Sequence, residues 1–279
     1  MKRTHILQQG HPLIMGILNL TPDSFSDGGS HTDRGRAVSH ALRMVEEGAA
    51  IIDVGGESTR PGSERVSAGE QQRRVLDVIK ALRQTLPEAV AISIDTTLSE
   101  VARRAVEAGA DILNDVSAGT EDPGMLELAA DHDLPIVLMH MQGSPGTMQR
   151  NPSYTDVVAE VEAYLRQRAE AASAAGIPAE HIILDPGIGF GKTRAHNLAL
   201  MANLRRFVAT GHAVLLGASR KHFMGELCRE SDPGQLIGAT CATTVLGVQA
   251  GVRILRVHDV MANRQALEVA LAIGDPVTS

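Results

Sequence analysis

Aromatic residues are almost absent from this chain. Its 279 residues include four Phe, two Tyr and no Trp, although 43% of them are hydrophobic. A buried core must therefore be built from Val, Ile, Leu, Met and Ala rather than from stacked rings. The scarcity of rings also leaves little material for stacking against bases, and a formal net charge of −7 provides no basic surface for nucleic acid. We therefore expect no nucleic-acid partner.

Cysteine and long apolar runs are scarce as well. The two cysteines, Cys228 and Cys241, cannot form a disulfide framework, which indicates a reducing, cytoplasmic setting. We expect both to be small buried hydrophobes. Basic residues near the start are followed by no apolar stretch, and no run approaches a membrane span of about 18 residues. We expect a soluble, unexported chain with no membrane partner.

The chain does contain a repeated alternation of short apolar runs and helical patterns. Strand followed by helix, eight times over, predicts an α/β fold, the (β/α)8 TIM barrel, because near-continuous apolar runs suit strands buried on both faces. We expect a single domain over residues 1–279 with its core at about 13–273. A doubly wound open sheet is the alternative. The runs cover residues 13–18, 50–54, 91–95, 111–115, 135–140, 181–185, 213–218 and 252–258.

Several intervening segments carry helix boundary signals. The SAGE segment at 67–70 predicts a capping box at the start of a helix. Asp33 is expected to cap another helix, which Gly48 ends. Ser153 is expected to begin a longer helix that stops at Gly176.

Polar side chains gather where the apolar runs end. In a parallel barrel all eight C-terminal strand ends open onto one face, so these side chains are expected to converge. Loops that face water are polar in any case, but this does not explain so many carboxylate, amide, guanidinium and ammonium groups. Because the chain is acidic overall, an anionic substrate would need a local cluster of cations or a metal ion. The side chains are Asn19, Glu57, Thr59, Arg60, Asp95, Asn114, Asp115, His140, Asp185, Ser219, Lys221, Arg256 and His258.

Three glycine-rich loops follow strand ends. The loop at 19–29 has the flexibility of a lid over a ligand, because two adjacent glycines lie near its end. The loop at 54–63 allows close backbone approach and presents polar residues just past its strand. The loop at 185–193 is also rich in glycine, but it lacks the GxxxxGK[ST] spacing of a phosphate-binding loop.

Eight motifs at these strand ends resemble those of a known family. Together, and in the same order, they resemble the pterin-binding motifs of the dihydropteroate synthase family. The resemblance implies a folate-biosynthesis transferase that joins 7,8-dihydropterin pyrophosphate to p-aminobenzoate and releases pyrophosphate. It also implies a homodimer of β/α barrels and Mg²⁺ as cofactor. The motifs are NLTPDSFSDGG, DVGGESTRPGS, SIDT, NDV, LMHMQG, LDPGIGFGK, GASRK and RVHD.

The resemblance also implies a role for individual residues. In the pterin pocket, a carboxylate can accept the two parallel N–H donors of a pterin in a bidentate manner. On the pyrophosphate side, the amide oxygen of Asn19 would be a ligand of Mg²⁺. The implied pterin-binding residues are Asp95, Asn114, Met139, Asp185 and Lys221. The implied pyrophosphate-binding residues are Asn19, Thr59, Arg256 and His258.

The p-aminobenzoate side is implied to lie next to Lys221. Its residues are Arg60, Pro61, Phe190 and Ser219. Asp27 resembles a lid residue of the first loop, and the catalytic residues implied are Asp27, Arg60 and Lys221.

An aryl amine is already uncharged at neutral pH, so no strong base is needed to activate it. The difficult step is cleavage of the bond between the pterin methylene and oxygen, and we expect a dissociative substitution.

Two other functions fit parts of the pattern. A folate methyltransferase of the same barrel group would bind a pterin but would not need Asp27 in a lid or Arg60 beside a second substrate. A non-catalytic paralogue should have lost pyrophosphate or lid residues, and none is missing from the motifs.

One departure from the family pattern is His222, where we expect a smaller or a basic residue. We expect His140 to be structural.

Overall fold

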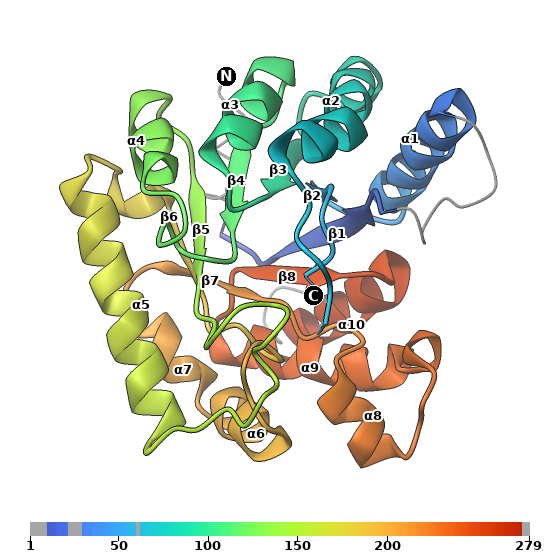
Figure 1. Ribbon diagram of the computed structural model, residues 1–279. Coiled ribbons are helices and arrows are strands. Elements are labelled where there is room, and N and C mark those ends of the chain that lie inside the picture. The colour runs from blue at the N-terminus through green and yellow to red at the C-terminus, as the bar shows by residue number, and fades with distance from the viewer. Residues whose placement is uncertain (1–9, 22–29, 60–61, 275–279) are drawn as a thin grey trace.

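Eight parallel strands form a closed barrel in the computed structural model, which describes residues 10–21, 30–59 and 62–274 (Figure 1). Each strand pairs with the next along the chain, and β8 pairs with β1. The TIM barrel prediction is therefore confirmed, and the open sheet is excluded. The strands are β1 (Leu13–Asn19), β2 (Ile51–Gly55), β3 (Ala91–Asp95), β4 (Ile112–Asp115), β5 (Ile136–Met139), β6 (Ile182–Asp185), β7 (Ala213–Leu216) and β8 (Ile254–Val257).

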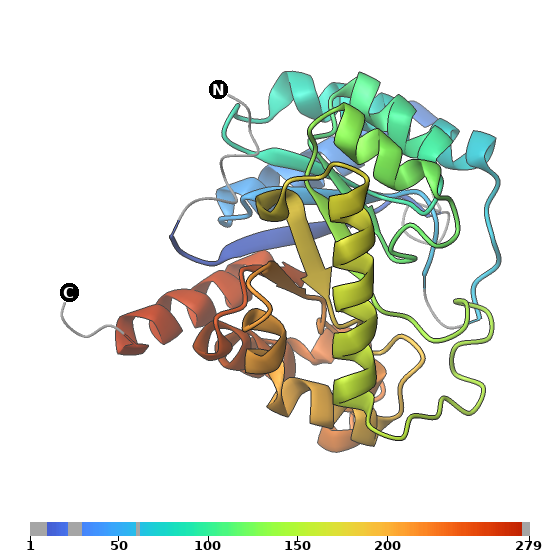
Figure 2. The ribbon, with the colours of Figure 1, turned by 90° about the vertical axis from the view of Figure 1, so that its left-hand side faces the viewer.

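The helices surround the barrel, and Figure 2 shows α5 running along its outside. Among the described residues, two connections contain an additional α-helix, α7 before β7 and α8 after it. No helix in the described ranges is both long and apolar enough to span a membrane. The helices are α1 (Ser30–Glu46), α2 (Ala68–Thr85), α3 (Ser99–Ala108), α4 (Gly124–Asp131), α5 (Val157–Ala174), α6 (Arg194–Ala202), α7 (Leu204–Val208), α8 (His222–Cys228), α9 (Ile237–Ala250) and α10 (Val260–Gly274).

The core has two layers because successive side chains of each strand point to opposite faces. A larger layer of aliphatic side chains lies between strands and helices. A smaller cluster fills the barrel interior and contains no aromatic ring, as the composition predicts. This interior cluster consists of Leu13, Met15, Ile51, Ala91, Ile112, Val137, Ile183, Leu215 and Ile254.

The start of α2 agrees in part with its predicted boundary. Ser67 is the N-cap, and its side chain accepts a hydrogen bond from the backbone N–H of Glu70 at 3.3 Å. The carboxylate of Glu70 does not complete a capping box, because it pairs with Arg73 and Arg74 instead. One half of the predicted motif is therefore present.

The predicted starts of α1 and α5 are wrong. Helix α1 begins at Ser30, which places Asp33 in its first turn. Helix α5 begins at Val157, and its cap is Asp156, whose Oδ1 accepts two backbone N–H groups at 3.0 and 3.1 Å. Ser153 cannot start the helix because its backbone N–H and C=O both bond to the side chain of Gln142.

The cysteines are free, but the expectation that both are buried is wrong. Cys228 is exposed at the end of the short helix α8, and Cys241 in α9 is partly buried. Both lie in the connection between β7 and β8, away from the interior cluster.

Candidate functional site at the C-terminal mouth of the barrel

Inward-facing side chains change from apolar to polar toward the C-terminal ends of the strands. Ile51 and Ile112 belong to the interior apolar cluster. Two residues further along the same strands, and therefore on the same face, lie Asp53 and Asn114. The barrel interior thus has an apolar floor with a polar layer above it.

Strand register aligns three predicted site residues and one glycine in a single row across four strands. Asn19 on β1 is opposite Gly55 on β2, Gly55 is opposite Asp95 on β3, and Asp95 is opposite Asn114 on β4. A Cβ atom on Gly55 would lie 3.6 Å from Oδ1 of Asn19 and 3.8 Å from Oδ2 of Asp95. The structure therefore brings these side chains together, as expected for residues at parallel strand ends.

Arg256 links three strands across the interior. Its Nε donates to Oδ2 of Asp53 at 2.7 Å, and its Nη2 donates to Oδ2 of Asp95 at 2.8 Å. The amide of Asn114 donates to both oxygens of Asp53, at 3.1 and 3.3 Å. Charge-assisted hydrogen bonds of this kind are stronger than neutral ones. We call Arg256, Asp53, Asp95 and Asn114 the interior network.

Asp53 is the member of this network that the strand-end pattern missed. It is fully buried and lies within the apolar run at 50–54 rather than at its end. A carboxylate in the middle of a buried strand needs a partner, because an unpaired buried charge is costly. That requirement was the available sequence signal, but the partner is 203 positions away in the sequence.

The two carboxylates predicted to bind pterin have raised pKa values. Burial raises the pKa of Asp95 to about 7, against the opposing effect of Arg256 and with added repulsion from Asp53. Burial raises the pKa of Asp185 to about 6, although the backbone N–H of Gly187 at 2.7 Å and the charge of Lys221 favour the ionised form. Buried carboxylates that titrate near neutrality are typical of functional sites.

The carboxylate of Asp185 faces a glycine on the neighbouring strand end. Asp185 is opposite Met139 in the register of β5 and β6. The residue after β7 on this side is Gly217, and a Cβ there would lie 3.7 Å from Oδ2 of Asp185. Because Gly217 has no side chain, a flat ligand could approach this oxygen.

Lys221 and Phe190 come together at the mouth. The Nζ atom of Lys221 lies 3.9 Å from the centroid of the Phe190 ring, which is a cation–π contact. Within the described ranges, Nζ has no hydrogen-bond or ion-pair partner in the protein. Burial lowers the pKa of Lys221 to about 8, and Arg256 lowers it further against Asp185 and Asp95.

Ser219 and His258 are paired at the adjacent strand ends. The side-chain oxygen of Ser219 is 3.0 Å from Nδ1 of His258 and accepts the backbone N–H of His258 at 3.2 Å. The turn between Ser219 and Lys221 places Arg220 in the left-handed region with φ 57, and its guanidinium forms two bonds to Asp259. This ion pair stabilises the turn that orients Ser219 and Lys221.

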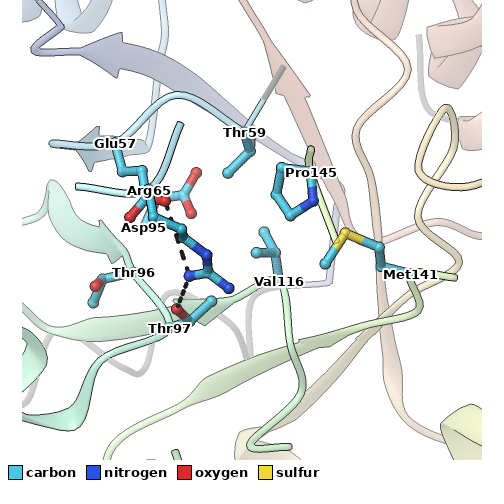
Figure 3. A pocket seen from close by; sticks show the side chains of 9 residues that line it. All are labelled: Glu57, Thr59, Arg65, Asp95, Thr96, Thr97, Val116, Met141 and Pro145. Atoms are coloured by element: carbon cyan, nitrogen blue, oxygen red, sulfur yellow. Dashed lines mark hydrogen bonds and ion pairs between the residues drawn. The ribbon is translucent and has the colours of Figure 1, made fainter. Parts of the chain in front are cut away.

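Thr59 lies in a pocket that Asp95 of the interior network also lines, and Figure 3 shows the side chains around it. Arg65 forms one wall, where its Nη1 donates to Thr97 at 3.2 Å and lies 3.9 Å from Glu57. Arg65 was not among the predicted site residues, because nothing in its local sequence shows that it contacts a neighbouring loop. The pocket is lined by Glu57, Thr59, Arg65, Asp95, Thr96, Thr97, Val116, Met141 and Pro145.

Three predicted site residues, Asp27, Arg60 and Pro61, lie outside the described residues. His222 is described, and its side chain is 89% exposed and lies 3.1 Å from Glu226. The departure from the family pattern at His222 therefore does not reach the mouth of the barrel.

The oxygen donors present suit one kind of metal ion. Asn19 and Asp95 present oxygens on either side of Gly55. In the ranges that the structure describes, no group of three or more His, Cys, Asp or Glu side chains could hold a metal ion. Mg²⁺ usually keeps several waters and binds one or two protein oxygens together with substrate phosphates. The residues present fit such an ion.

A family comparison agrees with this geometry, since the model of the pterin binding enzyme family matches residues 15–258. The chain belongs to the pterin-binding enzyme family. The resemblance that its motifs carry is therefore confirmed. Two relatives named dihydropteroate synthase are 46% identical. That of Synechocystis aligns over 93% of this chain and 89% of its own length, and that of Escherichia coli K12 over 95% and 93%.

Solved structures of the pterin-binding family agree with the fold as well. The dihydropteroate synthase of Xanthomonas albilineans with 4-aminobenzoic acid has a TM-score of 0.88 at 48% identity. The same enzyme in complex with 7,8-dihydropteroate has a TM-score of 0.85 at 44% identity. Both matches cover 95% of this chain and 94% of the other.

The interior network predicts a large stability effect at Asp53. In the Asp53→Ala variant, Arg256 loses one of its two carboxylates and Asn114 loses its acceptor. We expect the free energy of unfolding to fall by about 3–5 kcal/mol, the usual cost of breaking a buried ion pair. Denaturant unfolding would measure this. Asp77→Ala on the exposed face of α2 is the control, and a similar loss in both variants would contradict the assigned role of Asp53.

Proposed function

We propose that this chain condenses 7,8-dihydropterin pyrophosphate with p-aminobenzoate to give 7,8-dihydropteroate and pyrophosphate. The observation that carries the proposal is the cluster of two buried carboxylates with raised pKa values and a lysine whose ammonium group has no hydrogen-bond partner among the described residues, all at one mouth. Relatives named dihydropteroate synthase support it at 46% identity over nearly the whole chain.

The pterin would lie on the floor of the mouth. Asp185 offers its carboxylate to the ring N–H and exocyclic amino donors, and Gly217 leaves this side open. Lys221 donates to the ring carbonyl and a ring nitrogen. Asp95 and Asn114 bind the opposite edge, and Met139 packs against the flat face.

The pyrophosphate would lie at the rim, bound by Asn19, Thr59, Arg256 and His258. Arg256 is anchored by two carboxylates, so its charge is held in place before the substrate arrives. Mg²⁺, bound to the amide oxygen of Asn19 and to phosphate oxygens, would stabilise negative charge on the leaving group.

The p-aminobenzoate would lie between Phe190 and Ser219, beside Lys221. Arg60 and Pro61 would complete this side, and Asp27 would belong to the lid. These three assignments rest on the family motifs TRPGS and NLTPDSFSDGG. Two of the three proposed catalytic residues, Asp27 and Arg60, come from these motifs. The third, Lys221, lies between β7 and α8.

The reaction would be a substitution at the pterin methylene. The bond between methylene carbon and oxygen breaks, and pyrophosphate leaves with the electron pair. The neutral aryl amine then forms the new carbon–nitrogen bond and loses a proton. The carboxylates of Asp95 and Asp185 stabilise positive charge that develops on the pterin, so no strong general base is required.

A turnover assay tests the proposed function directly. The chain, 7,8-dihydropterin pyrophosphate, p-aminobenzoate and Mg²⁺ are mixed, and pyrophosphate release and dihydropteroate formation are followed. We expect turnover that chelation by EDTA abolishes and added Mg²⁺ restores. Folded protein that releases no pyrophosphate under these conditions would sink the enzyme assignment. Undiminished turnover in EDTA would contradict only the proposed requirement for Mg²⁺.

The pH dependence of pterin binding tests Asp185. The N–H donors of the pterin prefer the ionised carboxylate, so affinity should rise with pH through about 6 and then level off. Asp185→Asn removes the charge, and we expect it to weaken binding by roughly 30–100-fold and to abolish that rise, because it loses charge-assisted hydrogen bonds. Calorimetric titration from pH 5 to 8 measures both. The exposed variant Asp77→Asn should keep the native profile, and an unchanged profile in Asp185→Asn would exclude Asp185 from the site.

A homodimer in the cytoplasm completes the proposal. Helices α9 and α10 pack against each other and expose large apolar side chains, which supports an interface there. These are Leu246, Met261, Val269 and Ile273, between 50% and 71% exposed. The two free thiols suit a reducing compartment.

Charged substitutions test this interface. The double variant Met261→Glu and Val269→Glu should convert the dimer to a monomer in sedimentation equilibrium, because each protomer would bring two unpaired charges into the buried interface. Leu227→Glu on the exposed face of α8 should leave the dimer intact. A monomeric native protein, or a dimer that survives the double change, would contradict the proposed interface.

A further inference from the structure

Lys192 has a buried ammonium group that none of the proposed substrate contacts uses. The residue is 3% exposed and lies at the end of the glycine-rich loop after β6. Its Nζ lies 3.0 Å from Nδ1 of His140, 3.2 Å from the carbonyl oxygen of His140, and 2.9 Å from the carbonyl oxygens of both Gly187 and Phe190. An ammonium group has three hydrogens. These four acceptors therefore saturate it.

The contacts of Lys192 join two loops of the barrel mouth. His140 directly follows β5, whereas Gly187 and Phe190 belong to the loop after β6. His140 is buried, and burial together with the charge of Lys192 lowers its pKa to about 3, so its ring is neutral and can accept a hydrogen bond. Burial also lowers the pKa of Lys192, to about 7.

The loop after β6 depends on backbone contacts for its position. Gly187, Gly189 and Gly191 all have positive φ, at 66, 84 and 63. A Cβ on Gly187 would lie 1.9 Å from the carbonyl oxygen of His140, so the backbones of the two loops are in direct contact. Glycine-rich backbone has high intrinsic freedom. Hydrogen bonds to the loop must therefore hold it in one conformation.

Phe190 transmits this restraint to the site. Lys192 bonds the carbonyl of Phe190, and the Phe190 ring packs with Val116, Met139 and Met148 and faces Nζ of Lys221 at 3.9 Å. A shift of the Phe190 backbone would therefore move the ring away from Lys221. By contrast, Asp95 and Asn114 are held by the interior network, which does not contact Lys192. Asp185 is the one pterin residue tied to this loop, because it accepts the N–H of Gly187 at 2.7 Å.

We propose that Lys192 is a positioning residue that holds the Phe190 ring in place for the aryl amine substrate. The inference rests on the proposed function, because it requires Phe190 to line the p-aminobenzoate side. Loss of the ammonium group leaves buried carbonyls without a donor, and the flexible loop can relax to solvate them. The affinity for the aryl amine should then fall more than the affinity for the pterin, because Asp95 and Asn114 keep their contacts with the interior network.

Two substitutions separate this role from general stability. Lys192→Met keeps the length and apolar stem of the side chain but removes the donors, and Lys192→Arg keeps the charge with a different donor geometry. We expect the KM for p-aminobenzoate to rise roughly tenfold or more in Lys192→Met, and by less in Lys192→Arg. The KM for dihydropterin pyrophosphate should rise less, because only Asp185 among the proposed pterin contacts bonds to this loop, whereas Asp95 and Asn114 belong to the interior network. Lys80→Met, an exposed lysine on α2, is the matched control.

Hydrogen–deuterium exchange of the substrate-free protein gives a readout without turnover. The backbone amides of residues 187–191 should lose protection in both Lys192 variants but not in Lys80→Met. Equal rises of both KM values, or unchanged KM for p-aminobenzoate in Lys192→Arg with unchanged exchange, would overturn the positioning role. If Lys192→Met does not fold, the KM values and the amide exchange of Lys192→Arg test the positioning role. Failure of the native chain to turn over would instead refute the proposed function, and the exchange result would still test the loop restraint.

Discussion

The ion pair between Arg256 and Asp53 is the interaction on which the rest of the site depends. Asp53 is fully buried, and a buried charge is tolerated only when it is paired and hydrogen-bonded. Arg256 meets that need and at the same time reaches Asp95, while Asn114 satisfies the remaining oxygen positions of Asp53. One guanidinium therefore lets the barrel interior change from apolar to polar within two residues along β2 and β4. Without it, the buried carboxylates of the mouth would destabilise the fold.

Two cations, Arg256 and Lys192, hold different parts of the site in place. Arg256 holds side chains that project from strands and so orders the floor. Lys192 holds backbone carbonyls of loops and so orders one wall. Lys221 lies between them, without a protein hydrogen-bond partner among the described residues and with a lowered pKa. Two of these three cations are thus satisfied by contacts within the protein, whereas Lys221 has only its contact with Phe190 among the described residues.

The sequence predicted those features that follow from local pattern. Strand positions, the barrel and the convergence of Asn19, Asp95 and Asn114 follow from buried parallel strands whose ends share one face. Asp53 and Lys192 were missed because their importance lies in partners brought near only by the fold. Local signals also failed where two candidates competed. Ser153 and Asp156 are both acceptable helix caps, and the contacts of Ser153 with Gln142 decided between them.

The interior ion pair also bears on how the chain reaches its fold during synthesis. Arg256 lies on β8, and it follows Asp53 by 203 positions and Asp95 by 161. A nascent chain that has not yet produced β8 carries these carboxylates without their counter-charge, and enclosing them in a partial barrel would be costly. Contacts so distant in sequence also form late, because loop closure must precede them. The arrival of the last strand therefore supplies both the closing edge of the sheet and the charge that makes a closed interior stable.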